Sequence, residues 1–164
     1  MRTSLLTLTA LATLAASAGA QAKTDFSGTW KRNAEKSDPM GGPGGGGGGG
    51  GMMANATWTI TQAADKITIA LQAGEMNRTS TYSLDGKESV NPGMRGAEVK
   101  STAKWEGASL VIESTQTMSG PNGDMTITSK EVRTLSEDGK TMTVVTTRTT
   151  PQGERTTKAV YDKQ

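Results

Sequence analysis

The 164-residue chain contains no cysteine and no histidine, and these two absences exclude several classes of functional site. Without cysteine there is no disulfide, no thiolate nucleophile, no thiolate-bound metal and no N-terminal cysteine for a lipid anchor. Without histidine the chain lacks the side chain that most often serves as a general base near neutral pH and most often binds metals. We therefore expect a fold held by its hydrophobic core alone, with no metal, no other cofactor and no catalytic residues.

An excess of one charge and long hydrophobic runs are also missing. The chain has 18 Lys and Arg against 16 Asp and Glu, a net charge of +2, and only 4% of its residues are aromatic. The basic residues are scattered among acidic ones without a stripe of stacking aromatics, so we predict no nucleic-acid partner. After the N-terminal region no segment is apolar for the roughly 20 residues that span a bilayer, so we predict no transmembrane segment in the mature chain. The oligomeric state stays open.

Residues 1–22 have the pattern of a secretory signal peptide. Arg2 is a lone positive charge, an apolar stretch follows around Leu5 to Leu14, and Ala20-Gln21-Ala22 offers a cleavage site. We expect the mature chain to begin near Lys23 and the protein to be exported, either to a periplasm or out of the cell.

A glycine tract interrupts the mature chain. Residues 40–53 read MGGPGGGGGGGGMM, and glycines bury nothing while losing much backbone entropy on ordering. A phosphate-binding loop would need a following Lys and Ser or Thr at the start of a helix, and none follows. We predict a disordered loop over residues 40–56, inserted in a single domain between an N-terminal strand and turn at 23–39 and the remaining strands at 57–164.

The rest of the chain alternates apolar and polar residues with the period of β-strands. TWTITQ at 57–62 and KITIAL at 66–71 form the first such pair, and Asp85-Gly86, Glu106-Gly107 and Asp138-Gly139 mark later hairpin turns. No mature segment keeps helical spacing over several turns. These features predict an all-β, antiparallel up-and-down meander of about eight to ten strands that closes into a barrel, with a two-sheet sandwich as the alternative.

The stretch FSGTWK, Phe26 to Lys31, resembles the N-terminal Gly-x-Trp signature of the lipocalin and fatty-acid-binding-protein superfamily. The last strand also resembles the Arg-x-Tyr strand of fatty-acid-binding proteins, with Tyr161 at the tyrosine but Ala159 where the arginine would stand. The resemblance implies a lipocalin-like barrel for small apolar ligands, without the arginine that grips a carboxylate. The chain lacks the pair of helices of intracellular members, and it is similar to exported, uncharacterised bacterial lipocalin-like proteins that carry SGTWK.N..KS.

Trp30 of this signature has two interpretations. It could plug one end of the barrel, or its ring could face a ligand. Full burial of such a side chain contributes on the order of 2 to 3 kcal/mol, which is reason enough for a structural role. We therefore predict that Trp30 is the barrel plug.

Charged residues stand at positions that alternation directs into the barrel. If Met125 and Ile127 face inward, strand alternation also turns Ser129, Glu131, Arg133 and Leu135 inward. Likewise, if Met142 and Val144 face inward, so do Thr146 and Arg148. Glu131 and Arg133 must then pair, meet water at an open mouth, or be turned outward by a bulge that brings Val132 inward. The small residues Val99, Ser101 and Ala103 leave space beside them.

Two of the candidate ligand-binding residues, Arg133 and Arg148, follow from this parity, and one further arginine and two tyrosines are grouped with them. Arginine side chains suit carboxylate or phosphate groups, and tyrosines offer a hydroxyl at the end of an apolar ring. In the functional interpretation, these residues bind an anionic head group at the mouth of the barrel. In the alternative, they are solvated surface charges. The candidates are Arg78, Tyr82, Arg133, Arg148 and Tyr161.

Five carboxylates fall in predicted turns, where their ordinary role is to hydrogen-bond the backbone. A glycosidase would need two of them opposed across a cleft, so a hydrolase ranks third among the possible functions. These residues are Asp65, Asp85, Glu106, Asp138 and Glu154. We predict an exported, non-catalytic, lipocalin-like protein that binds a small apolar or amphipathic molecule. The alternative is an envelope or extracellular interaction module with a solid-packed barrel.

Overall fold

The computed structural model describes residues 24–39, 56–93, 96–120 and 123–164, and these form ten antiparallel strands with no α-helix among them. The signal-peptide prediction at 1–22 and nearly all of the predicted loop at 40–56 lie outside the described residues. The strands are β1 (Gly28–Asn33), β2 (Thr57–Gln62), β3 (Lys66–Ala73), β4 (Met76–Ser83), β5 (Ser89–Pro92), β6 (Glu98–Glu106), β7 (Ser109–Gly120), β8 (Gly123–Leu135), β9 (Thr141–Thr150) and β10 (Gly153–Lys163).

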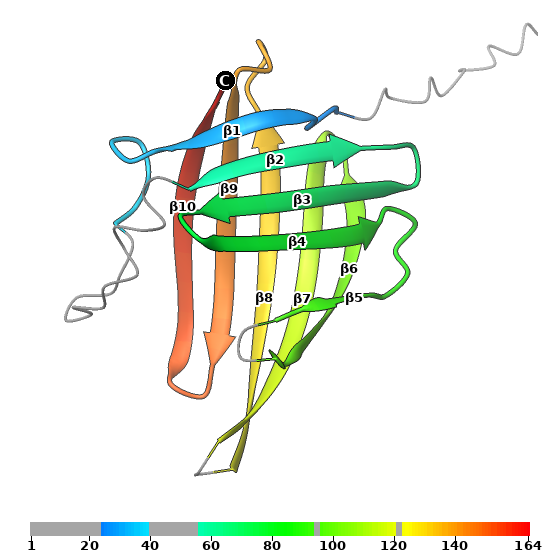
Figure 1. Cartoon of the computed structure of the whole chain (residues 1–164), viewed down its shortest axis with the longest axis vertical. Helices are drawn as coiled ribbons and strands as arrows, with labels where there is room; N and C mark the ends of the chain where they lie inside the picture. Colours follow the sequence, from blue (N-terminus) through cyan, green and yellow to red (C-terminus); the bar gives the residue numbers. More distant parts are fainter. Residues whose placement is uncertain (1–23, 40–55, 94–95, 121–122) are drawn as a thin grey trace, which may run out of the picture.

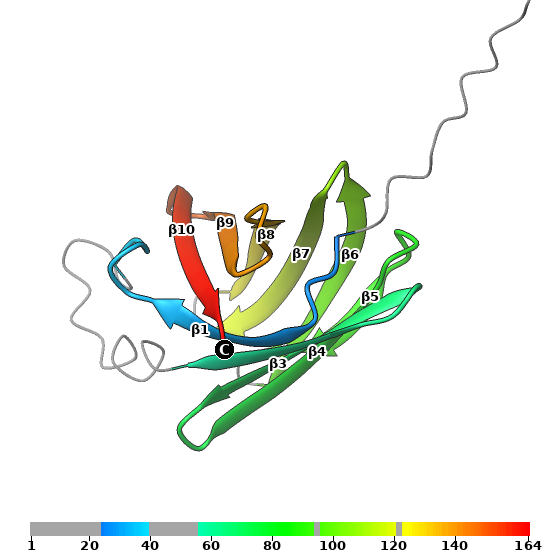
Figure 2. The same ribbon diagram turned by 90° about the horizontal axis from the view of Figure 1, so that it is seen from above.

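All ten strands belong to one sheet, in the order β4-β3-β2-β1-β10-β9-β8-β7-β6-β5. Strands that follow one another in the sequence are paired throughout, except at β4 and β5, and β1 pairs with β10, which joins the first described strand to the last. Figure 1 shows β2, β3 and β4 crossing in front of the long strands β7 to β10, and Figure 2 shows the sheet curving round on itself. The predicted all-β meander and barrel are confirmed, and the described strands do not form a two-sheet sandwich.

The strands form where apolar residues alternate with polar ones. In β3 the burial alternates along the strand, and Ile69 pairs with Ile60 of β2 while Leu71 pairs with Trp58. Such cross-strand apolar pairs are the main stabilising unit of a sheet. The turns follow their predicted chemistry as well, because Gly107 and Gly139 have φ values of 62° and 66°, a backbone region that favours glycine.

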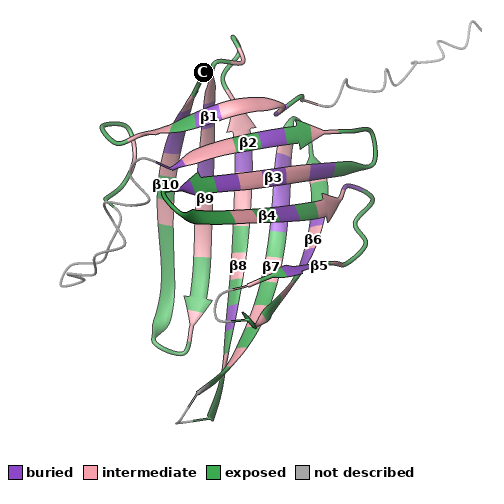
Figure 3. Ribbon diagram, viewed as in Figure 1, coloured by how far each residue is buried: buried purple, intermediate pink, exposed green. Residues whose placement is uncertain are grey.

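The hydrophobic core fills one end of the barrel. Trp30 and Phe26 are fully buried there, the Trp30 indole Nε1 donates a hydrogen bond of 2.9 Å to the Phe26 carbonyl oxygen, and the Trp105 ring stacks on Phe26 with ring centroids 6.0 Å apart. The Nζ of Lys163 lies 5.3 Å from the centroid of the Trp30 ring. Figure 3 shows buried positions of β9 and β10 near the crossing of β1, whereas the far halves of these strands are exposed or half-buried.

The barrel closes between β4 and β5 through side chains. Within the described ranges no backbone ladder joins these two strands. Instead the Asn91 side chain, 6% exposed, accepts a hydrogen bond of 2.7 Å from the Thr81 amide and donates one of 3.0 Å to the Thr81 carbonyl oxygen. The Ser89 hydroxyl accepts a further bond from the Ser83 amide at 2.9 Å. The Asn91 amide therefore takes the place of a missing backbone partner.

Candidate functional site

A cavity of about 260 Å³ occupies the half of the barrel away from the Trp30 end. Part of its wall is apolar and part is charged or hydrogen-bonding. The apolar lining comes from Trp58, Ile69, Leu71, Val99 and Ile127. The polar lining comes from Arg78, Ser80, Tyr82, Ser114, Gln116, Ser129, Glu131, Arg133, Thr146 and Arg148.

Regular pairing of β8 with both neighbours decides which of its residues enter the barrel. The β7–β8 and β8–β9 ladders run without an extra residue, so Glu131 lies opposite Ile112 and Thr146, and Arg133 lies opposite Leu110 and Val144. The alternative in which a bulge turns Val132 inward is wrong. An unbroken ladder keeps strict alternation, so both charged side chains enter the lumen.

Arg133 is 3% exposed, and its charge is compensated inside the barrel. Its Nε and Nη2 both contact Glu131 Oε1, and its Cζ lies 5.5 Å from the centroid of the Trp58 ring. The Trp58 ring in turn meets the Tyr161 ring edge-on, with centroids 5.9 Å apart. A planar guanidinium is well suited to this double role, since it stacks on an aromatic face and donates hydrogen bonds in its plane. Among the three ways in which this charge could be accommodated, ion pairing is the one observed.

Both tyrosines stay protonated at neutral pH. Burial raises the pKa of the Tyr82 phenol above its ordinary value, and the nearby Glu131 carboxylate raises it further. Burial also raises the pKa of Tyr161, and the charge of Arg133 counteracts part of that effect. Tyr82 lines the cavity, whereas Tyr161, 7% exposed, contacts Trp58 and belongs to the core cluster.

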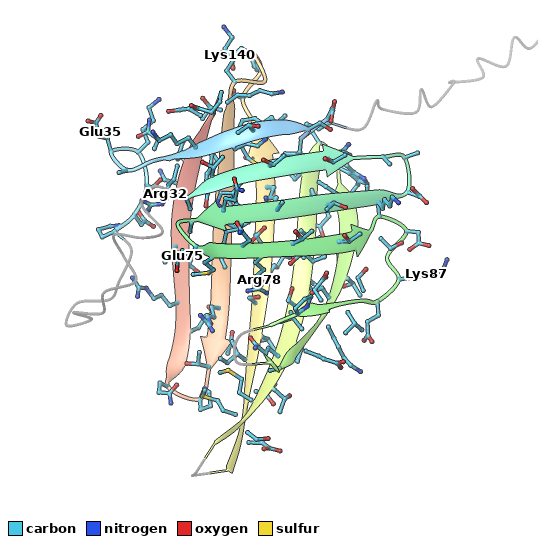
Figure 4. All side chains as sticks on the ribbon, in the orientation of Figure 1. Arg32, Glu35, Glu75, Arg78, Lys87 and Lys140 are labelled. Carbon is cyan, nitrogen blue, oxygen red and sulfur yellow. The ribbon has the colours of Figure 1, made fainter. Side chains whose placement is uncertain are left out.

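Two arginines stand at the outer part of the cavity. Arg148 is exposed at a position paired with Ser129, and Arg78 is half-buried opposite Leu71. Figure 4 labels Arg78 beside β4, in front of the long strands behind it. Of the five candidate ligand-binding residues, four therefore line one cavity, and Tyr161 lies outside this lining. Their role in binding a ligand stays a prediction.

The structure adds two residues to the site that the sequence pattern did not single out. Alternation along β2 places Trp58 on an apolar face, and the structure shows that this residue is also the cavity wall against which Arg133 stacks. Gln116 also lines the cavity, and its Nε2 is buried without a hydrogen-bond partner among the described residues. The inward parity of β7 could have identified Gln116, because Leu110 and Ile112 precede it on the same face. No local pattern pointed to the stacking of Trp58.

The small residues of β6 are divided between cavity and core. Val99 lines the cavity, whereas Ala103 is fully buried in the core. Ser101, 2% exposed, forms a hydrogen bond of 2.8 Å with the Ser114 hydroxyl across the strands. Of these three residues, Val99 is the one that borders the barrel cavity.

Two of the turn carboxylates have the structural role predicted for them. Asp85 accepts hydrogen bonds from the Ser83 hydroxyl, the Lys87 amide and the Lys87 ammonium, and these bonds lower its pKa. Asp138 accepts bonds from the Ser136 hydroxyl and the Lys140 amide, which also lower its pKa. Both carboxylates therefore hydrogen-bond within the turns in which they lie.

Comparison with known proteins identifies the fold. No family model and no curated protein sequence matches the chain. Solved structures do match: REP1-NXSQ fatty acid transporter (TM-score 0.59, 15% identity), zebrafish ileal bile acid-binding protein complexed with cholic acid (0.58, 19%) and a mutant of the fluorescent protein UnaG (0.57, 21%). Each covers 85% of this chain, and 96%, 98% and 96% of the respective matched chain is covered. The chain thus shares the antiparallel barrel fold of these proteins, as the resemblance of the Gly-x-Trp signature implied.

The expectation about membrane-spanning segments can be compared with the helices of the structure. Among the residues that the structure describes, no helix has the length and hydrophobicity needed to cross a membrane.

Proposed function

We propose that this protein binds a small apolar or amphipathic molecule in the barrel cavity and does not act on it chemically. The observation that carries the proposal is a single cavity whose lining combines apolar side chains, such as Trp58, Ile69 and Leu71, with arginines and hydroxyl groups. A molecule with an apolar body and a polar end matches such a lining, since binding sites are mostly apolar with a few placed polar groups.

The volume of the cavity favours a small ligand. At about 260 Å³ it lies just below the range of roughly 300 to 1,000 Å³ that is usual for small-molecule sites. The cavity also weighs against the alternative of a solid-packed interaction module, because that alternative requires the lumen to be filled. The matched structures add support at the level of the fold, as two of them are described as a fatty acid transporter and a bile acid-binding protein.

We further propose that the protein is exported and binds its ligand in a periplasm or outside the cell. The support is the signal-like pattern of residues 1–22, with Arg2, a short apolar stretch and the cleavage site before Lys23. Sequencing the N-terminus of the protein recovered from the cell envelope and from the medium tests this. A start near Lys23 is expected, whereas an intact Met1 in the cytoplasmic fraction alone would contradict it.

Native mass spectrometry tests the binding proposal most directly. The full chain is expressed with its leader, recovered from the envelope fraction, and weighed before and after delipidation. We expect a reproducible bound mass that a fluorescent fatty-acid probe displaces one for one. A bare polypeptide mass, together with no saturable probe binding by a folded β-protein, would overturn the proposal and direct attention to macromolecular partners.

A further inference from the structure

The inner charge of the cavity is already paired, and this restricts which ligand can reach it. Arg133 is the most buried arginine of the lining, yet its guanidinium contacts the Glu131 carboxylate on one side and the Trp58 ring on another. A ligand anion that approached Arg133 would have to displace Glu131 from its partner.

The residues directly across from this ion pair offer Glu131 no replacement cation. Those opposite Glu131 are Ile112 and Thr146, and those opposite Arg133 are Leu110 and Val144. A displaced Glu131 would therefore lose its buried partner close to the ligand's own negative charge, and the remaining arginines of the lining, Arg78 and Arg148, lie in the outer part of the cavity. Unpaired buried charge and like-charge contact are both costly, and together they select against an anionic partner.

Uncharged groups, in contrast, find hydrogen-bonding partners in the same cavity. The Gln116 Nε2 is a buried donor without a partner among the described residues, and the Tyr82 phenol, which also lines the cavity, stays neutral. A hydroxyl can accept from one donor and donate to another oxygen, so it satisfies such groups without disturbing the ion pair.

We propose that Glu131 is a specificity-determining residue: as the internal counter-ion of Arg133, it makes the cavity select a neutral, hydroxyl-bearing amphiphile over a carboxylate. The proposal rests on the proposed function and names its ligand class. Arg78 and Arg148 also line the cavity, but Arg78 is half-buried and Arg148 is exposed, so both are better hydrated than Arg133. Arg148 is exposed, and charge interactions at exposed sites are weak and screened by salt.

Calorimetric titration with octanol and octanoate at neutral pH tests the proposal, because the two probes share a chain and differ in head group. For the unaltered protein we expect octanol to bind at least about tenfold more tightly than octanoate. Glu131→Gln keeps the size of the side chain and releases the charge of Arg133. This variant should bind octanoate about tenfold more tightly than the unaltered protein does, and its affinity for octanol should change by no more than about threefold.

Glu113→Gln is the matched control. Glu113 is exposed on the outer face of β7, where its carboxylate lies 4.0 Å from the Lys130 ammonium, so the variant removes the same charge outside the cavity. The octanol-to-octanoate ratio should not move. If Glu131→Gln fails to fold, Arg133→Gln serves in its place. This variant leaves Glu131 as a lone charge, so its affinity for octanoate should be lower than that of the unaltered protein.

The outcomes separate the two proposals. If neither probe binds any variant, the cavity is not a site for small amphiphiles and both proposals fail. If the probes bind but octanoate equals or exceeds octanol in the unaltered protein, the role of Glu131 is overturned and the binding function stands. That role is also overturned if Glu131→Gln and Glu113→Gln shift the ratio equally, or if Arg133→Gln tightens octanoate.

Discussion

The two halves of this barrel are built by the same strands but in different ways. At the closed end, Trp30 and Phe26 are fully buried within a packed apolar cluster. At the other end, the inward positions turn polar, as when Met142 and Val144 of β9 give way to Thr146 and Arg148. Apolar burial is thus concentrated at one end, where it stabilises the whole sheet. The strands are continuous, so the other half can hold a cavity and a buried charge without a core of its own.

Truncating the plug should be the most damaging single change. Trp30→Ala removes a fully buried ring and leaves a void, which we expect to cost about 3 to 5 kcal/mol of the free energy of unfolding. Urea unfolding followed by circular dichroism measures this. Trp58→Ala is the paired variant in the cavity half, and it should cost less because Trp58 is only half-buried. Equal costs for the two tryptophans would contradict the contrast between the halves.

The side-chain closure between β4 and β5 should rank second. Asn91→Ala leaves the Thr81 amide and carbonyl without the partners that the buried Asn91 side chain provides, which we expect to cost about 1 to 3 kcal/mol. In the variant, the backbone amide hydrogen of Thr81 should exchange faster than in the unaltered protein. The amide of Thr68, whose strand is paired on both sides, should change less. Unchanged exchange at Thr81 in the variant would show that the strands are held by other contacts.

A smaller effect should appear at alkaline pH. The pKa values of Tyr82 and Tyr161 are raised in the folded protein, so above the ordinary value of 10.0 the unfolded chain loses these protons first. The folded state then binds more protons, and the free energy of unfolding falls as the pH rises. Urea unfolding measured on either side of that pH should show a shallower decline in the Tyr82→Phe, Tyr161→Phe double variant. An identical decline would exclude a contribution from the two phenols.

The smallest effect on stability should come from the outer part of the cavity. Arg148 is exposed, so Arg148→Gln should change the free energy of unfolding by no more than about 0.5 kcal/mol. The variant separates stability from binding in the cavity half. Thermal melting checks it, and a loss of several degrees would mean that Arg148 supports the sheet after all.

Much of this architecture could be predicted from local patterns. Alternation along β8 predicted that Glu131 and Arg133 share a face, and the Asp-Gly pairs predicted the turns at Asp85 and Asp138, because strand period and turn chemistry act over a few residues. The Asn91 closure was not predictable in this way. It depends on two strands that meet only after the sheet has curved round, so no spacing in the sequence records it.

The chain's own residue pattern was enough to determine an all-β meander. Together with the resemblance of the Gly-x-Trp signature it also predicted a buried Trp30, whereas the inward direction of Arg133 and Arg148 depended on unbroken alternation. Only the tertiary structure decided that β8 carries no bulge, that Arg133 takes Glu131 as its partner, and that Trp58 provides the surface between Arg133 and Tyr161. The physical reason is the range of the interactions. Parity and turns are set by neighbours along the chain, whereas the partner of a buried charge is set by which strands the closed barrel brings together.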